Sequence, residues 1–263
     1  MSESDSELIV ERRGGVLRIV LNRPKAANAV TVPMRDAIIE ALSEADRNPE
    51  VRAVSLSAVG KHFCSGADVS LISGASYPGD GMKRIMNGAQ RLVGAIYDCS
   101  KPVVCSVQGT ALGMGAHMAF ASDIVVASED ASFVEVFVTR GITVDAGGAW
   151  LLPRLVGLQK AKELIYFGDK ISAEEACSLG LVNKAVSASE LDKAADGYLD
   201  RLEKSPTTAL SFAKRQLNRA FESDRASAFV IEAMAQEINS RTDDAGEGIK
   251  SFLERRPPNF KGV

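Results

Sequence analysis

The sequence predicts an α/β fold that continues into a helical C-terminal region, and three observations support this. Up to Asp130, short apolar runs alternate with segments whose apolar residues recur at helical spacing, which is typical of a sheet covered by crossover helices. The stretch 101–123, KPVVCSVQGTALGMGAHMAFASD, joins one such run to one such segment through a glycine turn. Beyond Gly147 the pattern changes to that of successive helices.

The first part of the chain is predicted to form a hairpin, a helix and a further strand. Leu8–Glu11 and Val16–Leu21 flank an Arg-Arg-Gly-Gly turn, the pattern of a β-hairpin. Apolar residues at helical spacing predict a helix from about Val32 to Asp46, which Asn48-Pro49 ends. Val51–Leu56 is again an apolar run and is expected to be a strand.

The next elements surround the glycine-rich centre of the chain. Between residues 70 and 81 the composition turns to Gly, Ser, Tyr and Pro, which predicts a surface loop beside a functional site. A helix from Met82 to Asp98 precedes the strand, turn and helix of 101–123. Ile124–Ala127 and Ser132–Val134 are expected to be two more short strands.

The remainder of the chain is predicted to be helical. Ser172-Ala-Glu-Glu has the form of a capped helix start, and the prolines of the tail RRPPNFKGV end the fold. The expected helices are Trp150–Leu155, Gln159–Phe167, Ala173–Leu179, Ala188–Glu203, Thr207–Phe221, Ala226–Ile238 and Asp243–Glu254.

Composition excludes several classes of function. The 263 residues, 46% hydrophobic and 25% charged, suit one large domain or one domain with a small appendage. A net charge of -3 without basic blocks argues against nucleic-acid binding. No apolar run approaches the roughly 20 residues that span a bilayer, and the acidic start MSESDSELIV is no secretory signal. We therefore expect a cytoplasmic protein without a membrane partner.

The cysteines and histidines predict neither disulfides nor a metal site. Cys64, Cys99, Cys105 and Cys177 are scattered without paired spacing, which favours reduced thiols. His62 and His117 are the two histidines, and no clustered set of ligands accompanies them.

The glycine turn of 101–123 suggests stabilisation of an oxygen by backbone groups. Glycines let the backbone approach a ligand closely, and the first N–H groups of a helix have no partner within it. A P-loop would need a Gly-Lys-Ser/Thr end, and the dinucleotide fingerprint would need glycine where Met118 stands. The alternative is a tight turn before a buried helix.

Several motifs together carry a family resemblance. Ser65-Gly66-Ala67-Asp68 and the run from Gly109 to Gly115 occur with KPVV, GLVNKAV and the terminal RRPPNF, in order and at familiar spacing. Over residues 8 to 260 the chain resembles the crotonase superfamily, the enoyl-CoA hydratases and isomerases. The resemblance implies a spiral of ββα units over 1–200 that carries an acyl-CoA site. It also implies helices over 201–263 that pack on the core and on neighbouring subunits, in a homotrimer or a dimer of trimers.

The resemblance also assigns roles to individual residues. It places an oxyanion hole on the backbone N–H groups of Ala67 and Met114, beside Gly66 and Gly113; such a donor contributes about 3–4 kcal/mol to transition-state stabilisation. It implies a coenzyme A thioester substrate and no separate cofactor. For Lys25 and Arg255 a solvated surface charge is the alternative reading. Residues assigned to the coenzyme A portion or to the pocket beside it are Lys25, Ala26, Ala27, Asp68, Leu71 and Arg255.

Two positions depart from the family pattern. A typical hydratase activates water with two glutamates, and their positions hold His117 and Phe137. Phe137 cannot transfer protons, so the ordinary route of water addition is not expected. His117 is either a buried, hydrogen-bonded histidine or a base. Glu135 shares a strand face with Phe133 and Phe137 and would point into the pocket.

One carboxylate stands at a position that the family uses for chemistry. Asp145 matches the single catalytic aspartate of isomerase branches that include the ring-epoxide isomerases of phenylacetyl-CoA breakdown. In its apolar neighbourhood, desolvation should raise the pKa of Asp145, which suits a base that must return its proton. The alternative is an N-cap for a helix that begins near Ala146.

The sequence therefore favours an acyl-CoA isomerase with Asp145 as its acid and base, and three alternatives stay open. One is a hydratase that uses His117 and Glu135 in an altered arrangement. The second is nucleophilic attack by Asp145, as in aryl-CoA dehalogenases of the superfamily. The third is an acyl-CoA-binding trimer without activity.

Overall fold

A computed structural model describes residues 6–68 and 80–263, so the predicted pocket residue Leu71 and most of the loop 70–81 lie outside the described residues. Within this part a six-stranded sheet has the order β1-β2-β3-β4-β6-β9. β1 and β2 form the predicted antiparallel hairpin, and the other neighbours are parallel. Its strands are β1 Leu8–Arg13, β2 Val16–Leu21, β3 Ala53–Ala58, β4 Val103–Val107, β6 Ile124–Ser128 and β9 Lys184–Val186.

A second, smaller sheet holds β5 (Thr110–Leu112), β7 (Ser132–Val134) and β8 (Ile171–Ser172) among the described residues. The chain passes from β4 directly into β5, and from β6 into β7, so consecutive strands leave the large sheet for the small one. The helix α4 (Met114–Phe120) begins two residues after β5. This path brings the glycine turn of 109–115 to the junction of the two sheets.

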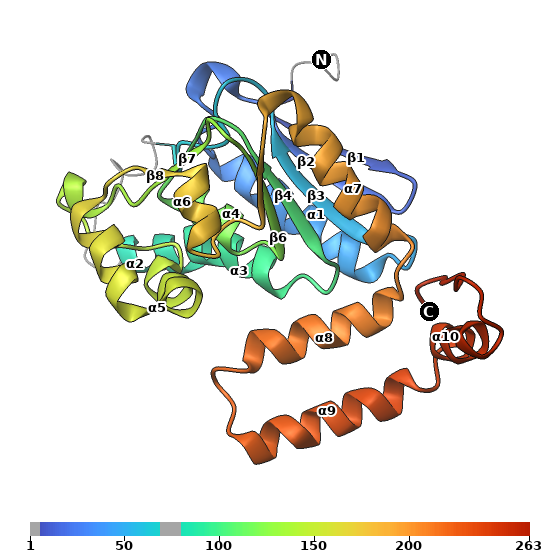
Figure 1. Ribbon diagram of the computed structural model, residues 1–263. Helices are drawn as coiled ribbons and strands as arrows, with labels where there is room; N and C mark the ends of the chain where they lie inside the picture. Colours follow the sequence, from blue (N-terminus) through green and yellow to red (C-terminus); the bar gives the residue numbers. More distant parts are fainter. Residues whose placement is uncertain (1–5, 69–79) are drawn as a thin grey trace.

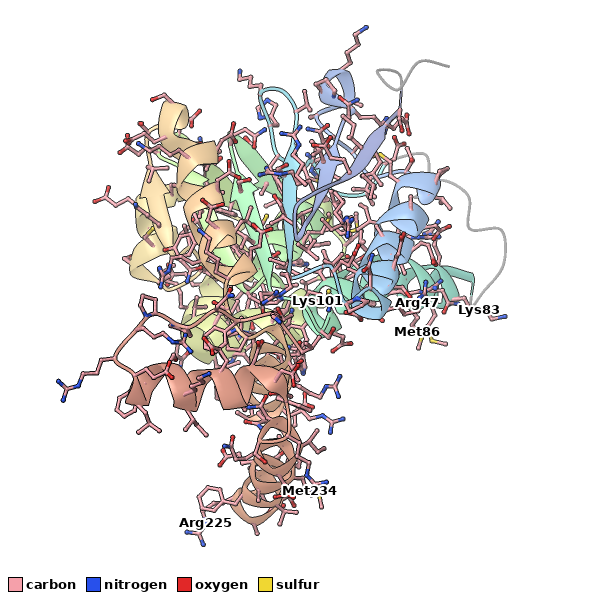
Figure 2. All side chains as sticks on the ribbon, turned by 90° about the vertical axis from the view of Figure 1, so that its right-hand side faces the viewer. Arg47, Lys83, Met86, Lys101, Arg225 and Met234 are labelled. Atoms are coloured by element: carbon pink, nitrogen blue, oxygen red, sulfur yellow. The ribbon has the colours of Figure 1, made fainter. Side chains whose placement is uncertain are left out.

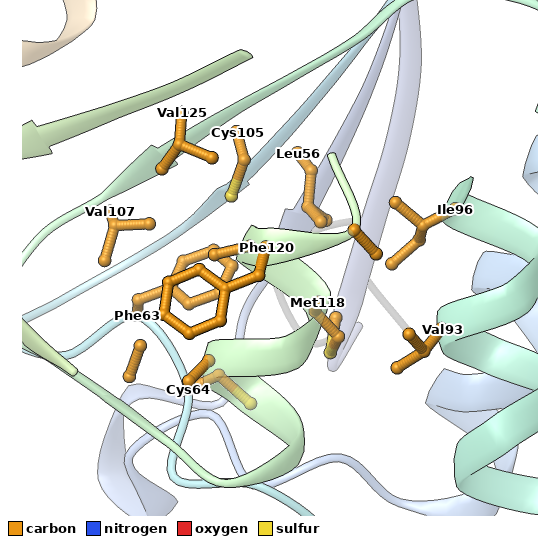
Figure 3. Close-up of a cluster of buried hydrophobic side chains, with 14 of the residues drawn as sticks. Leu56, Phe63, Cys64, Val93, Ile96, Cys105, Val107, Met118, Phe120 and Val125 are labelled. Carbon is orange, nitrogen blue, oxygen red and sulfur yellow. The ribbon is translucent and has the colours of Figure 1, made fainter. Parts of the chain in front are cut away.

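Helices cover both faces of the large sheet, as the sequence predicts (Figure 1). On one face α1 (Val32–Arg47), α3 (Arg91–Asp98) and α4 enclose the main core. Figure 3 shows Met118 of α4 beside Val93 and Ile96 of α3 in this core. On the other face α7 (Leu191–Glu203) packs across β3, β4 and β6. The α/β prediction is confirmed.

Two helical segments differ in detail from regular continuous helices. The predicted helix 82–98 consists of α2 (Asp80–Ile85), a π-helical turn (Met86–Gln90) and α3. The helices predicted at 150–155 and 159–167 form the two parts of α5 (Gly148–Phe167), which are separated by a kink at the non-helical Gly157, with a φ of 76°. Short helical turns occupy Pro24–Ala26, Val138–Arg140 and Ala188–Glu190.

The last helices extend below the sheets (Figure 1). α6 (Ala173–Ser178) still belongs to the core and is capped by Ser172, as predicted; α8 (Thr207–Arg219), α9 (Arg225–Asn239) and α10 (Asp243–Leu253) follow α7. Lys214 of α8 forms an ion pair with Asp123, whose carboxylate also accepts from Val103 N, so Asp123 has a structural role that joins α8 to the start of β4. The predicted division at residue 200 falls within α7. None of the described helices is long and apolar enough to cross a membrane.

Candidate active site

The two turns that carry the predicted oxyanion hole lie side by side. Leu112 N donates to Cys64 O at 2.9 Å, and Cys64 N donates to Thr110 O at 3.2 Å. A Cβ atom at Gly66 would lie 3.1 Å from Leu112 O and 3.9 Å from Met114 N, and Gly66 has a φ of +96°. Glycine at this position therefore lets the turn before Ala67 approach the start of α4 closely.

The local backbone hydrogen bonds do not use the N–H groups of Ala67 and Met114. Val30 N donates to Gly66 O and Asp68 N donates to Val30 O, so the bridge between these segments passes over Ala67 N. Met114 begins α4 and has no acceptor within the helix. Among residues 6–68 and 80–263, neither N–H has a backbone acceptor. Two such donors in adjacent turns can hold an oxygen that gains negative charge.

The segment assigned to coenzyme A lies against the first of these turns. Ser65 N donates to Ala27 O at 2.9 Å. Asn28 is buried with a φ of 54°, and its amide donates to Val59 O and His62 O. The side chain of Lys25 is exposed on this loop. Ala26 and Ala27 are partly exposed beside it.

Neither Asp68 nor Arg255 is placed as a charge that simply faces a ligand. The Asp68 carboxylate accepts from Arg23 Nη1 at 2.8 Å, so it fixes the turn to the loop around Arg23. Arg255 follows α10, with a φ of 54°, and α10 lies apart from the core elements of its own chain (Figure 1). The structure thus does not bring Arg255 to the two turns within one chain.

Asp145 lies in the loop before α5, and the alternative reading of its side chain as the N-cap is wrong. Gly147, with a φ of 81°, is the N-cap of α5, and no side chain caps this helix. The backbone carbonyl of Asp145 instead accepts a hydrogen bond at 3.0 Å from Gly148 N, at the start of α5. Its half-buried carboxylate has a pKa raised by desolvation, and the electrostatic influence of His117 opposes this in part.

His117 is a buried, hydrogen-bonded histidine. Its Nε2 lies 3.0 and 3.1 Å from the two carboxylate oxygens of Glu135. Its ring also stacks on Phe137, with centroids 5.5 Å apart at 15°. The reasoning that put Glu135 and Phe137 on one strand face is wrong, since β7 ends at Val134 and Phe137 begins a helical turn. Glu135 is nevertheless buried, and it faces His117.

A chain of contacts links these groups to the turns. A Cβ atom at Gly113 would lie 3.2 Å from Phe137 Cζ, and Phe137 stacks on His117. A Cβ atom at Gly148 would lie only 2.2 Å from His117 Cε1, so the ring packs directly against the first turn of α5. The backbone donors, the aromatic ring, the buried pair and Asp145 thus occupy one continuous region.

A cavity of about 680 Å³ lies between α3, α5 and α8. Tyr97, Trp150, Lys214 and Arg219 line it, and it reaches Gly147, two residues beyond Asp145. Sequence reasoning missed this cavity because its walls come from three helices far apart in the chain. It also missed Asn28, Arg23 and Gly148. An Asn in a turn was the available signal for Asn28, and a glycine pair before a helix was the signal for Gly148.

Comparisons with known proteins agree on one family. The model of the family described as enoyl-CoA hydratase/isomerase matches residues 11–263. A 1,2-epoxyphenylacetyl-CoA isomerase of Escherichia coli is 33% identical and the match covers 94% of this chain and 95% of the relative. A short-chain-enoyl-CoA hydratase of Clostridium acetobutylicum is 34% identical over 95% of this chain and 96% of the relative. The crystal structure of an enoyl-CoA hydratase/isomerase from Cupriavidus metallidurans superposes with a TM-score of 0.92 at 30% identity, covering 98% and 97% of the two chains.

Proposed function

The chain belongs to the enoyl-CoA hydratase/isomerase family, and from this premise we propose that it moves a double bond within an acyl-CoA thioester, with Asp145 as acid and base. One observation carries the proposal. A half-buried carboxylate stands beside His117 in the same region as Phe137, the residue that replaces a hydratase glutamate. Such a pocket offers one group for proton transfer.

The reaction needs only that group and the two backbone donors. Asp145 removes a proton from carbon 2 of a 3-enoyl thioester, and the electron pair moves toward the thioester oxygen. The N–H groups of Ala67 and Met114 hold the resulting dienolate oxygen. Asp145 then returns the proton at carbon 4, the double bond settles between carbons 2 and 3, and no atom is gained or lost.

The environment of Asp145 suits both halves of this cycle. A carboxylate with an ordinary pKa is a weak base, and desolvation raises the pKa of Asp145. A base whose pKa lies nearer to the working pH accepts a proton more readily and can still release it. One residue can therefore serve twice.

Water addition is the second candidate, and the hydratases among the relatives favour it. It would need Glu135 or His117 to activate water. Both are fully buried and bonded to each other, so neither side chain is exposed to solvent water. The buried pair therefore supports isomerisation over hydration.

Assembly, location and cofactor use stay predictions. We expect a homotrimer or a dimer of trimers built through α8, α9 and α10, with Arg255 serving the site of a neighbouring subunit. We expect a cytoplasmic enzyme that needs nothing beyond the coenzyme A portion of its substrate. The described cysteines are all free, which agrees with a reducing compartment.

The test is incubation of the purified protein with a 3-enoyl-CoA and, separately, a 2-enoyl-CoA in heavy-oxygen water. Products are separated by chromatography and weighed by mass spectrometry. The proposal predicts a shifted double bond and no oxygen from the solvent. Incorporation of heavy oxygen would establish the hydratase instead, and tight binding without any product would establish a binding protein.

A further inference from the structure

The cavity between α3, α5 and α8 has no part in the reaction steps proposed above, although it begins beside them. Its volume of about 680 Å³ lies within the range of sites that hold small ligands. Gly147 lines the cavity and follows Asp145 by two residues, so their Cα atoms are at most about 7.6 Å apart. The far part of an acyl group whose reacting carbons lie at Asp145 can therefore reach this cavity.

An apolar strip of the lining begins at Gly147. A Cβ atom at Gly147 would lie 3.6 Å from Val93 Cγ1 and 3.9 Å from Leu151 Cδ1, and both of these side chains are buried. The strip also includes Gly94 and Tyr97 of α3 and Trp150 of α5. The residues that α8 contributes are instead polar or charged: Ser211, Lys214, Arg215, Asn218 and Arg219. A hydrocarbon chain is therefore expected to lie along α3 and α5.

Tyr97 and Trp150 form a wall on this strip. Their rings meet edge to face, with centroids 5.0 Å apart at 86°. A second cavity, of about 230 Å³, is lined by the same two rings and also shares Leu151 and Asn218 with the larger one. The aromatic pair therefore separates two cavities that would otherwise join.

Hydrogen bonds and a cation–π contact hold this wall in place. Tyr97 Oη donates to Asn218 O at 3.0 Å, and Asn218 Nδ2 donates to Tyr97 O at 2.9 Å. The guanidinium of Arg154 lies 4.0 Å from the centre of the Trp150 ring. Contacts from α3, α5 and α8 thus fix the two rings, and a ligand cannot displace them without losing these contacts.

We propose that this cavity holds the distal hydrocarbon part of the acyl group, and that Tyr97 and Trp150 set the greatest acyl length that the enzyme accommodates. The inference rests on the proposed function, which places the thioester at the backbone donors and its reacting carbons at Asp145. Each methylene group that the cavity buries strengthens binding about fourfold. A methylene group that would have to pass the wall adds nothing.

The first experiment uses the unmodified protein, because Trp150 is its single tryptophan. Saturated acyl-CoA thioesters from hexanoyl to tetradecanoyl, each with bromine on the last carbon, are titrated while tryptophan fluorescence is recorded. Bromine quenches the indole at contact, and the thioesters without bromine are the matched controls. Quenching should be greatest at one intermediate chain length. Saturable binding without quenching at any length would overturn the inference.

The second experiment measures calorimetric affinity for saturated thioesters from butyryl-CoA to tetradecanoyl-CoA. Wild-type affinity should rise with each methylene group up to the wall and then level off. Tyr97→Ala joins the two cavities, so the rise should continue over at least two further methylene groups and strengthen binding of those longer thioesters by at least about tenfold. The affinity for butyryl-CoA should stay unchanged.

Tyr97→Phe is the matched control for this experiment. It removes the hydroxyl group that bonds Asn218 and keeps the ring, so the length at which affinity levels off should not move. A Tyr97→Ala protein that levels off at the wild-type length would overturn the role of the wall. If Tyr97→Ala fails to fold, Trp150→Leu opens the wall from α5 and carries the same prediction, and quenching in the wild-type protein still decides the matter.

These outcomes are independent of the chemistry assigned to Asp145, since a saturated thioester has no double bond to move. Turnover retained by Asp145→Asn would overturn the proposed function and leave the length limit standing. Acyl-CoA binding without a length limit would overturn this inference alone. A protein that binds none of the thioesters would contradict both.

Discussion

At the scale of single residues, Asp145 stands where its own charge is disfavoured. Its half-buried position removes water from the carboxylate, and His117 offsets only part of that loss, so the pKa of Asp145 stays raised. A carboxylate of this kind lowers the stability of the fold at neutral pH, and the same raised pKa makes it a better base. The sequence predicts this balance from the apolar residues around Asp145.

Replacing Asp145 by Asn should therefore stabilise the protein at neutral pH. The folded state binds the carboxyl proton more tightly than the unfolded state, whose pKa is about 3.9. Stability consequently falls as the pH rises through the window between the unfolded and the raised folded pKa. Thermal melting should give Asp145→Asn the higher midpoint at pH 7. Its advantage should shrink as the pH approaches 4, and an advantage that grew on acidification would contradict the desolvation argument.

At the scale of secondary-structure elements, the close contact between α4 and α5 depends on a glycine, Gly148, which has no side chain. A Cβ atom at Gly148 would lie 2.2 Å from His117 Cε1, 2.4 Å from Nε2 and 2.8 Å from Val144 Cγ2. The ring is held by Glu135 and Phe137 and cannot withdraw freely. Gly148 thus has a packing function beyond that of a helix start.

Gly148→Ala should lower the free energy of unfolding by about 1–3 kcal/mol, as expected for overpacking in a dense core. Gly197→Ala is the matched control, because Gly197 lies inside α7 with nothing within 4 Å of an added Cβ. There alanine should be neutral or stabilise by up to about 1 kcal/mol. Urea denaturation measures both. Equal stability of the two variants would mean that His117 does not pack against α5 as described.

Elements of five or more residues with a clear period were predictable, and of the shorter strands only β7 was predicted. β5, β8 and β9 have only two or three residues, too few for alternation to show, and their pairing is fixed by distant strands. The two backbone turns could be located because their glycines and spacing are distinctive. The contact of His117 with Glu135 could not, because it depends on the chain leaving β7 at Val134 and turning back.

At the scale of the whole molecule, the C-terminal helices leave large apolar side chains uncovered. Phe252 is 82% exposed, Leu253 and Phe221 are each 74% exposed, and Leu217 is 71% exposed. Figure 2 shows Met234 on the outside of α9, far from the sheets. Large apolar side chains exposed in this number on neighbouring helices suggest an interface between protein chains.

The predicted homotrimer should therefore depend on α10. Phe252→Asp combined with Leu253→Asp should shift the sedimentation-equilibrium mass from three or six times 28.0 kDa toward that of one chain. Charge placed in a buried apolar interface is costly because it loses its hydration. Lys193→Glu, on the exposed side of α7, is the control and should keep the assembly. A wild-type protein that sediments as a single chain would contradict the predicted assembly.

The central claim is that Asp145 is the one acid and base of a double-bond shift, and turnover of Asp145→Asn on a 3-enoyl-CoA tests it most directly. The asparagine keeps the shape of the side chain but cannot take a proton. Its kcat should fall at least about a hundredfold, while calorimetric binding of a saturated acyl-CoA stays within a few-fold of the wild-type value. Wild-type turnover in Asp145→Asn, with binding intact, would contradict the account.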